Sequence, residues 1–244
     1  MSSYHIHIEG QVQGVGFRPR VYRLAQSRGI AGKVTNGTRG LDIVFTAPKE
    51  KAEDFYHTVI ENKPPRAVIL RHYMEPTEPV FYSAFSIAES ERENNPVLLH
   101  ITPDLGLCDD CRKEILHAKD RRFGYPFTTC TQCGPRYSII KRLPYDREFT
   151  AMDAFSMCHS CEEEYHSPLN RRHFSQTNSC PDCAVKLFAF PGNTQESKQL
   201  NIPANTSSED IISLAIDALA SGFILAIKES AVTSSSVTLP IGKP

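Results

Sequence analysis

Near the start of the chain stands the stretch Gly10-Gln11-Val12-Gln13-Gly14-Val15-Gly16-Phe17-Arg18-Pro19. Closely spaced glycines let the backbone curl so that several N–H groups point inward. Pro19 suits the first turn of a helix, and helix N-termini attract anions. Arg18, at the end of the loop, can hold a phosphate through two parallel hydrogen bonds. The stretch predicts a phosphate-binding loop between a strand and a helix, although a tight turn with a surface arginine would read the same way.

The segments around this loop predict a ferredoxin-like domain over residues 1–91. Histidines alternate with isoleucines before the loop, which indicates a strand, and an apolar stripe after it indicates a helix. Further along we expect strands at 30–35 and 41–46 around a turn at 36–40, a helix at 48–62, and strands at 68–73 and 81–87. Strand, helix, strand, strand, helix, strand is the split order of that fold, with one extra strand candidate.

Two motifs of this domain resemble the acylphosphatase family: the glycine loop and Gly32-Lys33-Val34-Thr35-Asn36-Gly37. The resemblance covers residues 4–91. It implies that Arg18 binds the phosphate of an acyl phosphate and that Asn36 positions the attacking water, which makes these two the expected catalytic residues. A mixed anhydride has a good leaving group, so orientation and charge stabilisation can carry its hydrolysis. Taken alone, Asn36 could be a turn residue before Gly37. The expected phosphate-binding residues are Gln13, Gly14, Val15, Gly16, Phe17 and Arg18.

All the cysteines of the chain fall in four Cys-x-x-Cys pairs: Cys108/Cys111, Cys130/Cys133, Cys158/Cys161 and Cys180/Cys183. Two short pairs with 15–20 residues between them have the spacing of a four-thiolate zinc site. The two units also repeat at an offset that matches Glu114 with Glu164 and Arg121-Arg122 with Arg171-Arg172. We therefore expect two self-contained units and two structural zinc ions, one on the first two pairs and one on the last two.

Several alternatives accompany this interpretation of the cysteines. The first and third pairs could share one metal in a cross-braced arrangement, and His159, His166 or His173 could replace a thiolate. A redox role is disfavoured because one pair would suffice for it. The twin arginines could bind a phosphate or an acidic partner, and the simpler interpretation is that they form salt bridges on the surface.

The combination of an acylphosphatase-like domain with two such units resembles the hydrogenase-maturation carbamoyltransferases, the HypF family. The matching motifs are Cys130-Thr131-Gln132-Cys133-Gly134-Pro135-Arg136-Tyr137, Leu143-Pro144-Tyr145-Asp146-Arg147 and Cys161-Glu162-Glu163-Glu164-Tyr165, with Pro168 and Arg171-Arg172. The resemblance implies carbamoyl phosphate as substrate and carbamoylation of the C-terminal cysteine of a partner maturation protein, as a precursor of the cyanide ligand of nickel–iron hydrogenases. ATP and magnesium belong to the full-length family and are not expected to bind productively here.

The resemblance extends to about residue 228, and it divides the chain further. After a linker at 92–107 we expect the tandem zinc-finger domain at 108–190, a second linker at 191–207, and the start of a YrdC-like domain at 208–244. In that last part, 209–221 predicts a helix and 223–228 a strand. The family would continue with a glycine-rich stretch, whereas this chain reads Glu229-Ser230-Ala231-Val232. We therefore expect a truncated or frame-shifted form that lacks the nucleotide and transfer domains. The order of Arg172-His173-Phe174 also departs from the family pattern.

Composition narrows the remaining function classes. The formal net charge is −1, and thiolate-bound zinc would add negative charge to the cysteine units, which disfavours a nucleic-acid partner. No apolar run approaches the length of a membrane span, and paired cysteines suit a reducing compartment, so we expect a cytoplasmic protein with no membrane partner. The fold class is α+β: a ferredoxin-like domain, a small double zinc-finger domain and an incomplete α/β segment. The expected function is acyl-phosphate hydrolysis as part of a carbamoyltransferase. The alternative is a non-catalytic zinc-finger interaction module with a vestigial acylphosphatase fold.

Overall fold

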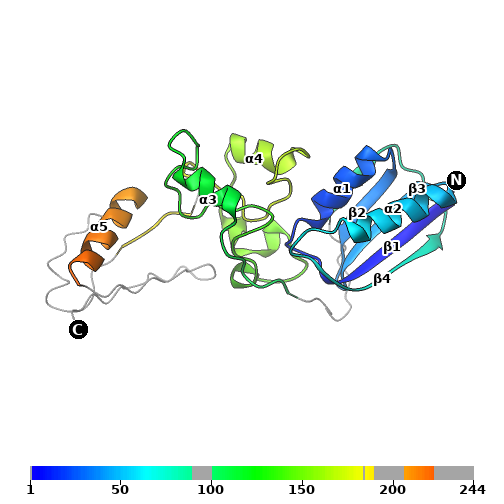
Figure 1. The fold of residues 1–244 in the computed structure, drawn as a ribbon, viewed down its shortest axis with the longest axis horizontal. Coiled ribbons are helices and arrows are strands. Elements are labelled where there is room, and N and C mark those ends of the chain that lie inside the picture. Colours follow the sequence, from blue (N-terminus) through cyan, green and yellow to red (C-terminus); the bar gives the residue numbers. More distant parts are fainter. Residues whose placement is uncertain (1, 90–100, 184, 190–205, 223–244) are drawn as a thin grey trace.

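A computed structural model describes residues 2–89, 101–183, 185–189 and 206–222. Its first part, residues 2–87, is here called the sheet domain, and residues 101–189 are called the finger region. In Figure 1 the finger region (green) lies beside the sheet domain (blue to cyan). The predicted α+β class, with a ferredoxin-like domain followed by a cysteine-rich finger region, is confirmed.

The sheet domain has a five-stranded sheet in the order β4-β1-β3-β2-β5. Strand β5 pairs in parallel with β2, and the other neighbours are antiparallel. Figure 1 shows both helices of the domain on one face of this sheet. The elements are β1 (Ser2–Gln11), α1 (Phe17–Ser27), β2 (Ala31–Asn36), β3 (Leu41–Ala47), α2 (Lys49–Glu61), β4 (Val68–Thr77) and β5 (Phe85–Ile87).

Alternation along the strands decides which face the helices cover. In β1 the residues Ile6 and Ile8 are fully buried beneath the helices, because they alternate with His5 and His7 on the opposite face. Helix α2 adds Phe55 and Val59 to the same core. Burial of this apolar face supplies most of the stability of such a layer.

Two strand boundaries differ from the sequence prediction by four residues each. Strand β4 continues to Thr77, and β5 begins only at Phe85, although a strand was expected from residue 81. The Phe81 side chain is 94% exposed, so the apolar residue that suggested an earlier start lies in solvent. Hydrophobic character alone therefore misplaced the beginning of this edge strand.

The described residues of the finger region form short elements and no sheet. Helices α3 (Asp109–Leu116) and α4 (His159–His166) each begin directly after the first cysteine of a unit, at Cys108 and Cys158. Between the units run three 3-10 helices, η1 (Tyr137–Ile139), η2 (Arg147–Phe149) and η3 (Ala151–Ala154). The matching positions of α3 and α4 show that the two units repeat in structure as well as in sequence.

Helix α5 (Ser208–Ala220) covers nearly the range predicted for the last helix, and its N-cap Ser207 accepts a hydrogen bond from the Asp210 N–H. The strand expected at 223–228 lies outside the described residues. Among the described helices, none has the length and apolar character needed to cross a membrane.

Candidate functional site

The glycine loop between β1 and α1 lines a cavity through Gln13, Gly14 and Gly16. Three successive loop carbonyls accept hydrogen bonds from side chains of residues 102–136. In a trans peptide the N–H of the next residue points away from such a carbonyl, so the N–H groups of Gly14, Val15 and Gly16 point to the other side. Within the described residues these three N–H groups donate to no protein oxygen. The three contacts are Thr102 Oγ1 to Gln13 O at 2.6 Å, Arg136 Nε to Gly14 O, and Gln132 Nε2 to Val15 O at 3.2 Å.

Two glycines of the loop are required by conformation and by space. Gly14 and Gly16 have φ of 72° and 77°, in the left-handed region that favours glycine. A Cβ on Gly14 would lie 2.9 Å from Arg136 Cδ, and one on Gly16 would lie 3.0 Å from Thr131 Cβ. The loop therefore combines left-handed backbone with close packing against the first cysteine unit.

The other predicted phosphate-binding residues outside the two glycines and Arg18 have buried side chains. Val15 and Phe17 bury their side chains in the core of the sheet domain. The Gln13 side chain is buried and donates from Nε2 to Gly37 O at 2.8 Å and to Gly40 O at 2.9 Å. Gln13 therefore ties the loop to the β2–β3 turn.

Arg18 and Asn36, the two predicted catalytic residues, lie in contact. With the Asn36 amide turned so that its oxygen faces Arg18, Oδ1 accepts from Nη2 at 3.1 Å and from Nε at 3.2 Å. Arg18 Nη2 also donates to Asp146 Oδ1 at 2.6 Å. The side chains of Arg18 and Asp146 are 8% and 17% exposed, so this ion pair is shielded from solvent. Asp146 is not among the residues that line the cavity, and it therefore holds the arginine from outside.

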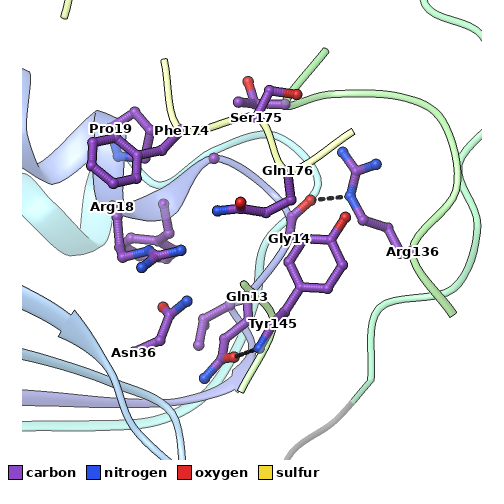
Figure 2. A pocket seen from close by; sticks show the side chains of 14 residues that line it. Gln13, Gly14, Arg18, Pro19, Asn36, Arg136, Tyr145, Phe174, Ser175 and Gln176 are labelled. Atoms are coloured by element: carbon purple, nitrogen blue, oxygen red, sulfur yellow. Dashed lines mark hydrogen bonds between the residues drawn. The ribbon is translucent and has the colours of Figure 1, made fainter. Parts of the chain in front are cut away.

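Both parts of the molecule line the cavity (Figure 2). The sheet domain contributes the loop, Arg18 and Asn36. The finger region contributes Tyr145 and, from the second cysteine unit, Phe174, Ser175 and Gln176. The site is thus assembled from segments more than a hundred residues apart in the sequence.

The cysteines group by unit, as the repeat suggested, and not in the cross-braced arrangement. Their sulfurs form two clusters, Cys108/Cys111/Cys130/Cys133 and Cys158/Cys161/Cys180/Cys183. A tetrahedral site with Zn–S bonds near 2.3 Å has sulfurs about 3.8 Å apart. The sulfur–sulfur distances are 3.5 to 3.9 Å in the first cluster and 3.6 to 3.8 Å in the second. The donor set and its size fit zinc, while His159, His166 and His173 lie outside both clusters.

The expectation that each unit is self-contained is wrong, because the twin arginines cross between the units. Arg122 is 2% exposed, and it bonds to Glu164 and to the carbonyl before Cys180. Arg172 of the second unit does the same to the first. The matching contacts are Arg122 Nη2 to Glu164 Oε2 at 2.6 Å, Arg122 Nε to Ser179 O at 2.9 Å, Arg172 Nη2 to Glu114 Oε2, and Arg172 Nε to Thr129 O at 2.9 Å.

The neighbouring arginines reach the cysteine sulfurs of the opposite unit. Arg121 Nη2 lies 3.1 Å from Cys161 Sγ, and Arg171 Nη2 lies 3.1 Å from Cys111 Sγ. Burial opposes the charged form of Glu164, but hydrogen bonds from Arg122 and Arg121 outweigh it and lower its pKa to about 2. The arginines therefore form ion pairs as the simpler interpretation held, yet Arg122 and Arg172 do so in the interior of the finger region.

The departure at Arg172-His173-Phe174 places an aromatic ring beside Arg18. Phe174 has φ of 54°, a strained conformation for a bulky residue, at the position where the first unit has Gly124 with φ of 67°. Both N–H groups make the same contact, Gly124 to Ile115 O and Phe174 to Tyr165 O. The Phe174 ring centroid lies 5.7 Å from Arg18 Cζ. The second unit thus differs from the first at the point where it contacts the cavity.

Sequence reasoning missed the finger residues that complete the site. Arg136 and Asp146 stand in motifs that were quoted for their family resemblance, but their partners Gly14 and Arg18 lie 122 and 128 positions away. No local pattern indicates such contacts. The one usable signal for Phe174 is that the second unit has it where the first unit has glycine.

Comparisons with known proteins agree with this geometry. The acylphosphatase family model matches residues 4–87, and the HypF finger model matches residues 107–140 and 157–188. The carbamoyltransferase HypF of Rhodobacter capsulatus is 39% identical over 231 residues, which is 93% of this chain and 29% of that protein. An acylphosphatase of Thermotoga maritima is 36% identical over 87 residues, 36% of this chain and 97% of that protein.

Solved structures give the same result for the whole arrangement. A full-length HypF in a phosphate- and nucleotide-bound form has a TM-score of 0.77 and 35% identity, covering 92% of this chain and 28% of that one. HypF of T. kodakarensis has a TM-score of 0.74 and 37% identity, covering 91% and 27%. The chain spans less than a third of the length of these relatives.

Proposed function

The chain belongs to the HypF family, with an acylphosphatase domain followed by HypF fingers, and from this premise we propose that it hydrolyses an acyl phosphate in the cavity between the glycine loop, Arg18 and Asn36. The observation that carries the proposal is the convergence of these three groups on one cavity. An interaction module without catalysis would have no need of a buried arginine beside unpartnered N–H groups.

The phosphate of the substrate binds to the loop N–H groups and to Arg18. Oriented N–H groups at the start of a helix favour an anion, and the guanidinium adds a full positive charge. Asp146 and Asn36 fix the Arg18 plane before substrate arrives. A donor set held in this way needs no reorganisation when charge develops on the phosphoryl group.

Asn36 orients the attacking water. The water oxygen forms a bond to phosphorus while the bond from phosphorus to the acyl oxygen breaks, and the electron pair of that bond leaves with the carboxylate. An acyl phosphate dianion and water thus give a carboxylate and dihydrogen phosphate. Because the leaving carboxylate is stable, positioning and charge stabilisation suffice.

Carbamoyl phosphate is the substrate that the relatives' name supports, since those proteins are called carbamoyltransferases. Its hydrolysis at this site gives carbamate and phosphate. In the complete reaction proposed for the family, the carbamoyl group goes on with ATP and magnesium to the C-terminal cysteine of a hydrogenase maturation protein. We assign only the first, hydrolytic step to the residues described here.

Zinc is the metal proposed for the two cysteine clusters, with Cys108, Cys111, Cys130 and Cys133 on one ion and Cys158, Cys161, Cys180 and Cys183 on the other. Four thiolates leave no open position, so the ions are structural. When bound they fix the fingers against the loop. Metal analysis of the purified chain should give about two zinc ions per molecule.

The proposed activity is tested by phosphate release from carbamoyl phosphate and acetyl phosphate. Arg18→Ala should abolish measurable binding of inorganic phosphate and lower kcat/KM by roughly 10²-fold or more. Asn36→Ala should lower kcat by roughly 10²-fold with a smaller change in phosphate binding. Arg20→Ala is the matched control, because Arg20 lies in the same helix and donates instead to Asn62 O. A wild-type chain that hydrolyses neither substrate would refute the proposal.

A further inference from the structure

Gln176 of the second cysteine unit has a fixed amide orientation. The residue is 3% exposed. Its Oε1 accepts from the Arg147 N–H at 2.9 Å and from the Tyr165 hydroxyl at 3.1 Å. Turning the amide over would place its NH₂ group against these two donors, so the hydrogen bonds themselves assign the oxygen. The Nε2 group must therefore point away from Arg147 and Tyr165.

That Nε2 group is a buried donor without an acceptor among the described residues. Gln176 lines the cavity that holds the loop, Arg18 and Asn36. In Figure 2 its side chain extends into this space toward Arg18. Buried amides are nearly always hydrogen-bonded, so an unpartnered one in a cavity points to a missing ligand.

Ser175 adds a second donor of the same kind. It is 2% exposed, its Oγ has no partner within the described part of the chain, and it also lines the cavity. Two consecutive residues that line the cavity thus carry buried polar atoms without a partner among the described residues. No such group is needed to hold the fold, because the contacts that fix this segment use Gln176 Oε1 and backbone carbonyls.

The phosphate end of a substrate is satisfied by the sheet domain, through the loop N–H groups and Arg18. The acyl end of a phosphate held there must then meet what the finger region contributes. In an acyl phosphate this end carries two oxygens, the carbonyl oxygen and the bridging oxygen, and both gain negative charge as the bond to phosphorus breaks. A neutral amide donor complements that charge without repelling the phosphate.

We infer that Gln176 is a substrate-binding residue whose Nε2 donates to an acyl oxygen of the acyl phosphate, so that the second cysteine unit completes the active site. This inference rests on the hydrolysis proposed above. The ligand class is a small acyl phosphate, carbamoyl phosphate included, and the stabilised group is its leaving carboxylate. Phosphorus–oxygen cleavage sends the electron pair to the bridging oxygen, and resonance in the carboxylate shares its charge with the carbonyl oxygen, so a donor to either oxygen stabilises the leaving group.

The test compares Gln176→Met with wild type in the full chain. Methionine keeps the length of the side chain and removes the donor. We expect kcat/KM for acetyl phosphate to fall by roughly 10²-fold, while the Kd for inorganic phosphate stays within about twofold, because the phosphate cradle is untouched. Across small acyl phosphates whose acids differ in strength, the loss should be greatest for the weakest acid, since its carboxylate most needs stabilisation.

Two further variants separate catalysis from structure. Tyr165→Phe removes a hydrogen bond to Oε1 but leaves Nε2 in place, and it should keep kcat/KM within about threefold of wild type. Gln176→Glu keeps an oxygen for Arg147 and Tyr165 and replaces the donor with a carboxylate, so it should lose at least as much activity as Gln176→Met.

The outcomes divide as follows. If wild type is active and either Gln176 variant retains its kcat/KM, or if Gln176→Met loses phosphate binding in parallel with activity, the inference is overturned while the hydrolase proposal stands. Equal losses for all acyl phosphates would also overturn it. If wild type releases no phosphate from any acyl phosphate, the proposed function fails, and the inference fails with it.

Discussion

The sheet domain and the finger region are held together by different forces. In the sheet domain, isoleucines, valines and phenylalanines of four strands and both helices form one buried apolar cluster, and the partly buried Ile69 and Met74 of β4 pack against it. In the finger region the largest fully buried side chain is Arg122, and Arg136 and Arg172 are buried as well. Apolar burial is a general and non-directional force, whereas buried arginines depend on each of their partners.

This difference shows which contacts position the residues of the candidate site. The apolar core fixes the loop, Arg18 and Asn36 within one domain, but the loop carbonyls of Gln13, Gly14 and Val15 accept hydrogen bonds from side chains outside the sheet domain. Asp146 likewise holds Arg18 from the finger region. The part of the molecule with the smaller apolar core therefore holds the loop and Arg18 of the part with the larger one.

Metal removal should produce the largest difference in stability between the sheet domain and the finger region. Small units that bury little apolar surface take most of their folding free energy from the metal. A chelator should unfold the finger region and leave the sheet domain folded, since its apolar cluster contains no cysteine. Circular dichroism should then keep the helix and strand signal of residues 2–87. Complete loss of secondary structure would show that the sheet domain depends on the fingers.

Arg122→Ala should damage the opposite cysteine unit. Removing Arg122 takes away the buried partner of Glu164 and leaves the more exposed Arg121 to pair with it, which should cost about 3 kcal/mol of stability or less. The second cluster should lose its metal more readily although its four cysteines are unchanged, which competition with a chelator measures. Arg112→Ala is the matched control, since Arg112 is exposed on α3. Equal metal affinities in the two variants would contradict the crossed arrangement.

A substitution on the sheet face opposite the helices should change stability less. There His5 and His7 both contact Asp42 Oδ1, at 2.8 and 2.7 Å. Burial opposes the charge on Asp42, but these hydrogen bonds lower its pKa to about 2 from 3.8. The hydrogen bond to Asp42 raises the pKa of His5 above 6.5. The shifted pKa of Asp42 therefore stabilises the folded state fully at any pH above the ordinary pKa of Asp42. The shifted pKa of His5 stabilises the folded state fully below pH 6.5, and this stabilisation is lost as the pH rises through the pKa of His5 in the folded protein.

Asp42→Asn should accordingly cost about 2 kcal/mol near pH 6, and less as the pH rises through the folded pKa of His5 and that side chain loses its charge. Thermal unfolding of wild type and variant between pH 6 and pH 9 measures the difference between their free energies of unfolding. Asp54→Asn is the control, because the Asp54 side chain is 67% exposed and pairs with Arg28 at the surface. A stability difference that stays constant or increases toward pH 9 would rule out a charged His5 as its cause.

The sequence predicted the sheet domain well because the strands and helices of this domain have a local periodicity of apolar residues. Alternating residues such as His5, Ile6 and His7 indicate a strand with one buried face. The main error, the early start at Phe81, came from an apolar residue that lies in solvent. The grouping of the cysteines was also predictable, because the repeat marks each unit.

The contacts between regions could not be predicted in this way. The repeat that paired Arg122 with Arg172 suggested two independent units, whereas each arginine serves the other unit. Arg136, Asp146 and Gln176 act across large separations, and a polar side chain carries no periodic signal for its partner. Such residues become visible only when folding brings the chain segments together.

The most direct test of the account is the affinity for inorganic phosphate before and after metal removal. The central claim is that the finger region orients the loop and Arg18, so the chelated chain should bind phosphate at least roughly tenfold more weakly than the untreated one, although its sheet domain stays folded. Isothermal titration calorimetry would measure the Kd for phosphate of the untreated and of the chelated chain. Added zinc should restore the Kd of the untreated chain. An unchanged Kd in chelated protein whose finger region has unfolded would contradict the claim.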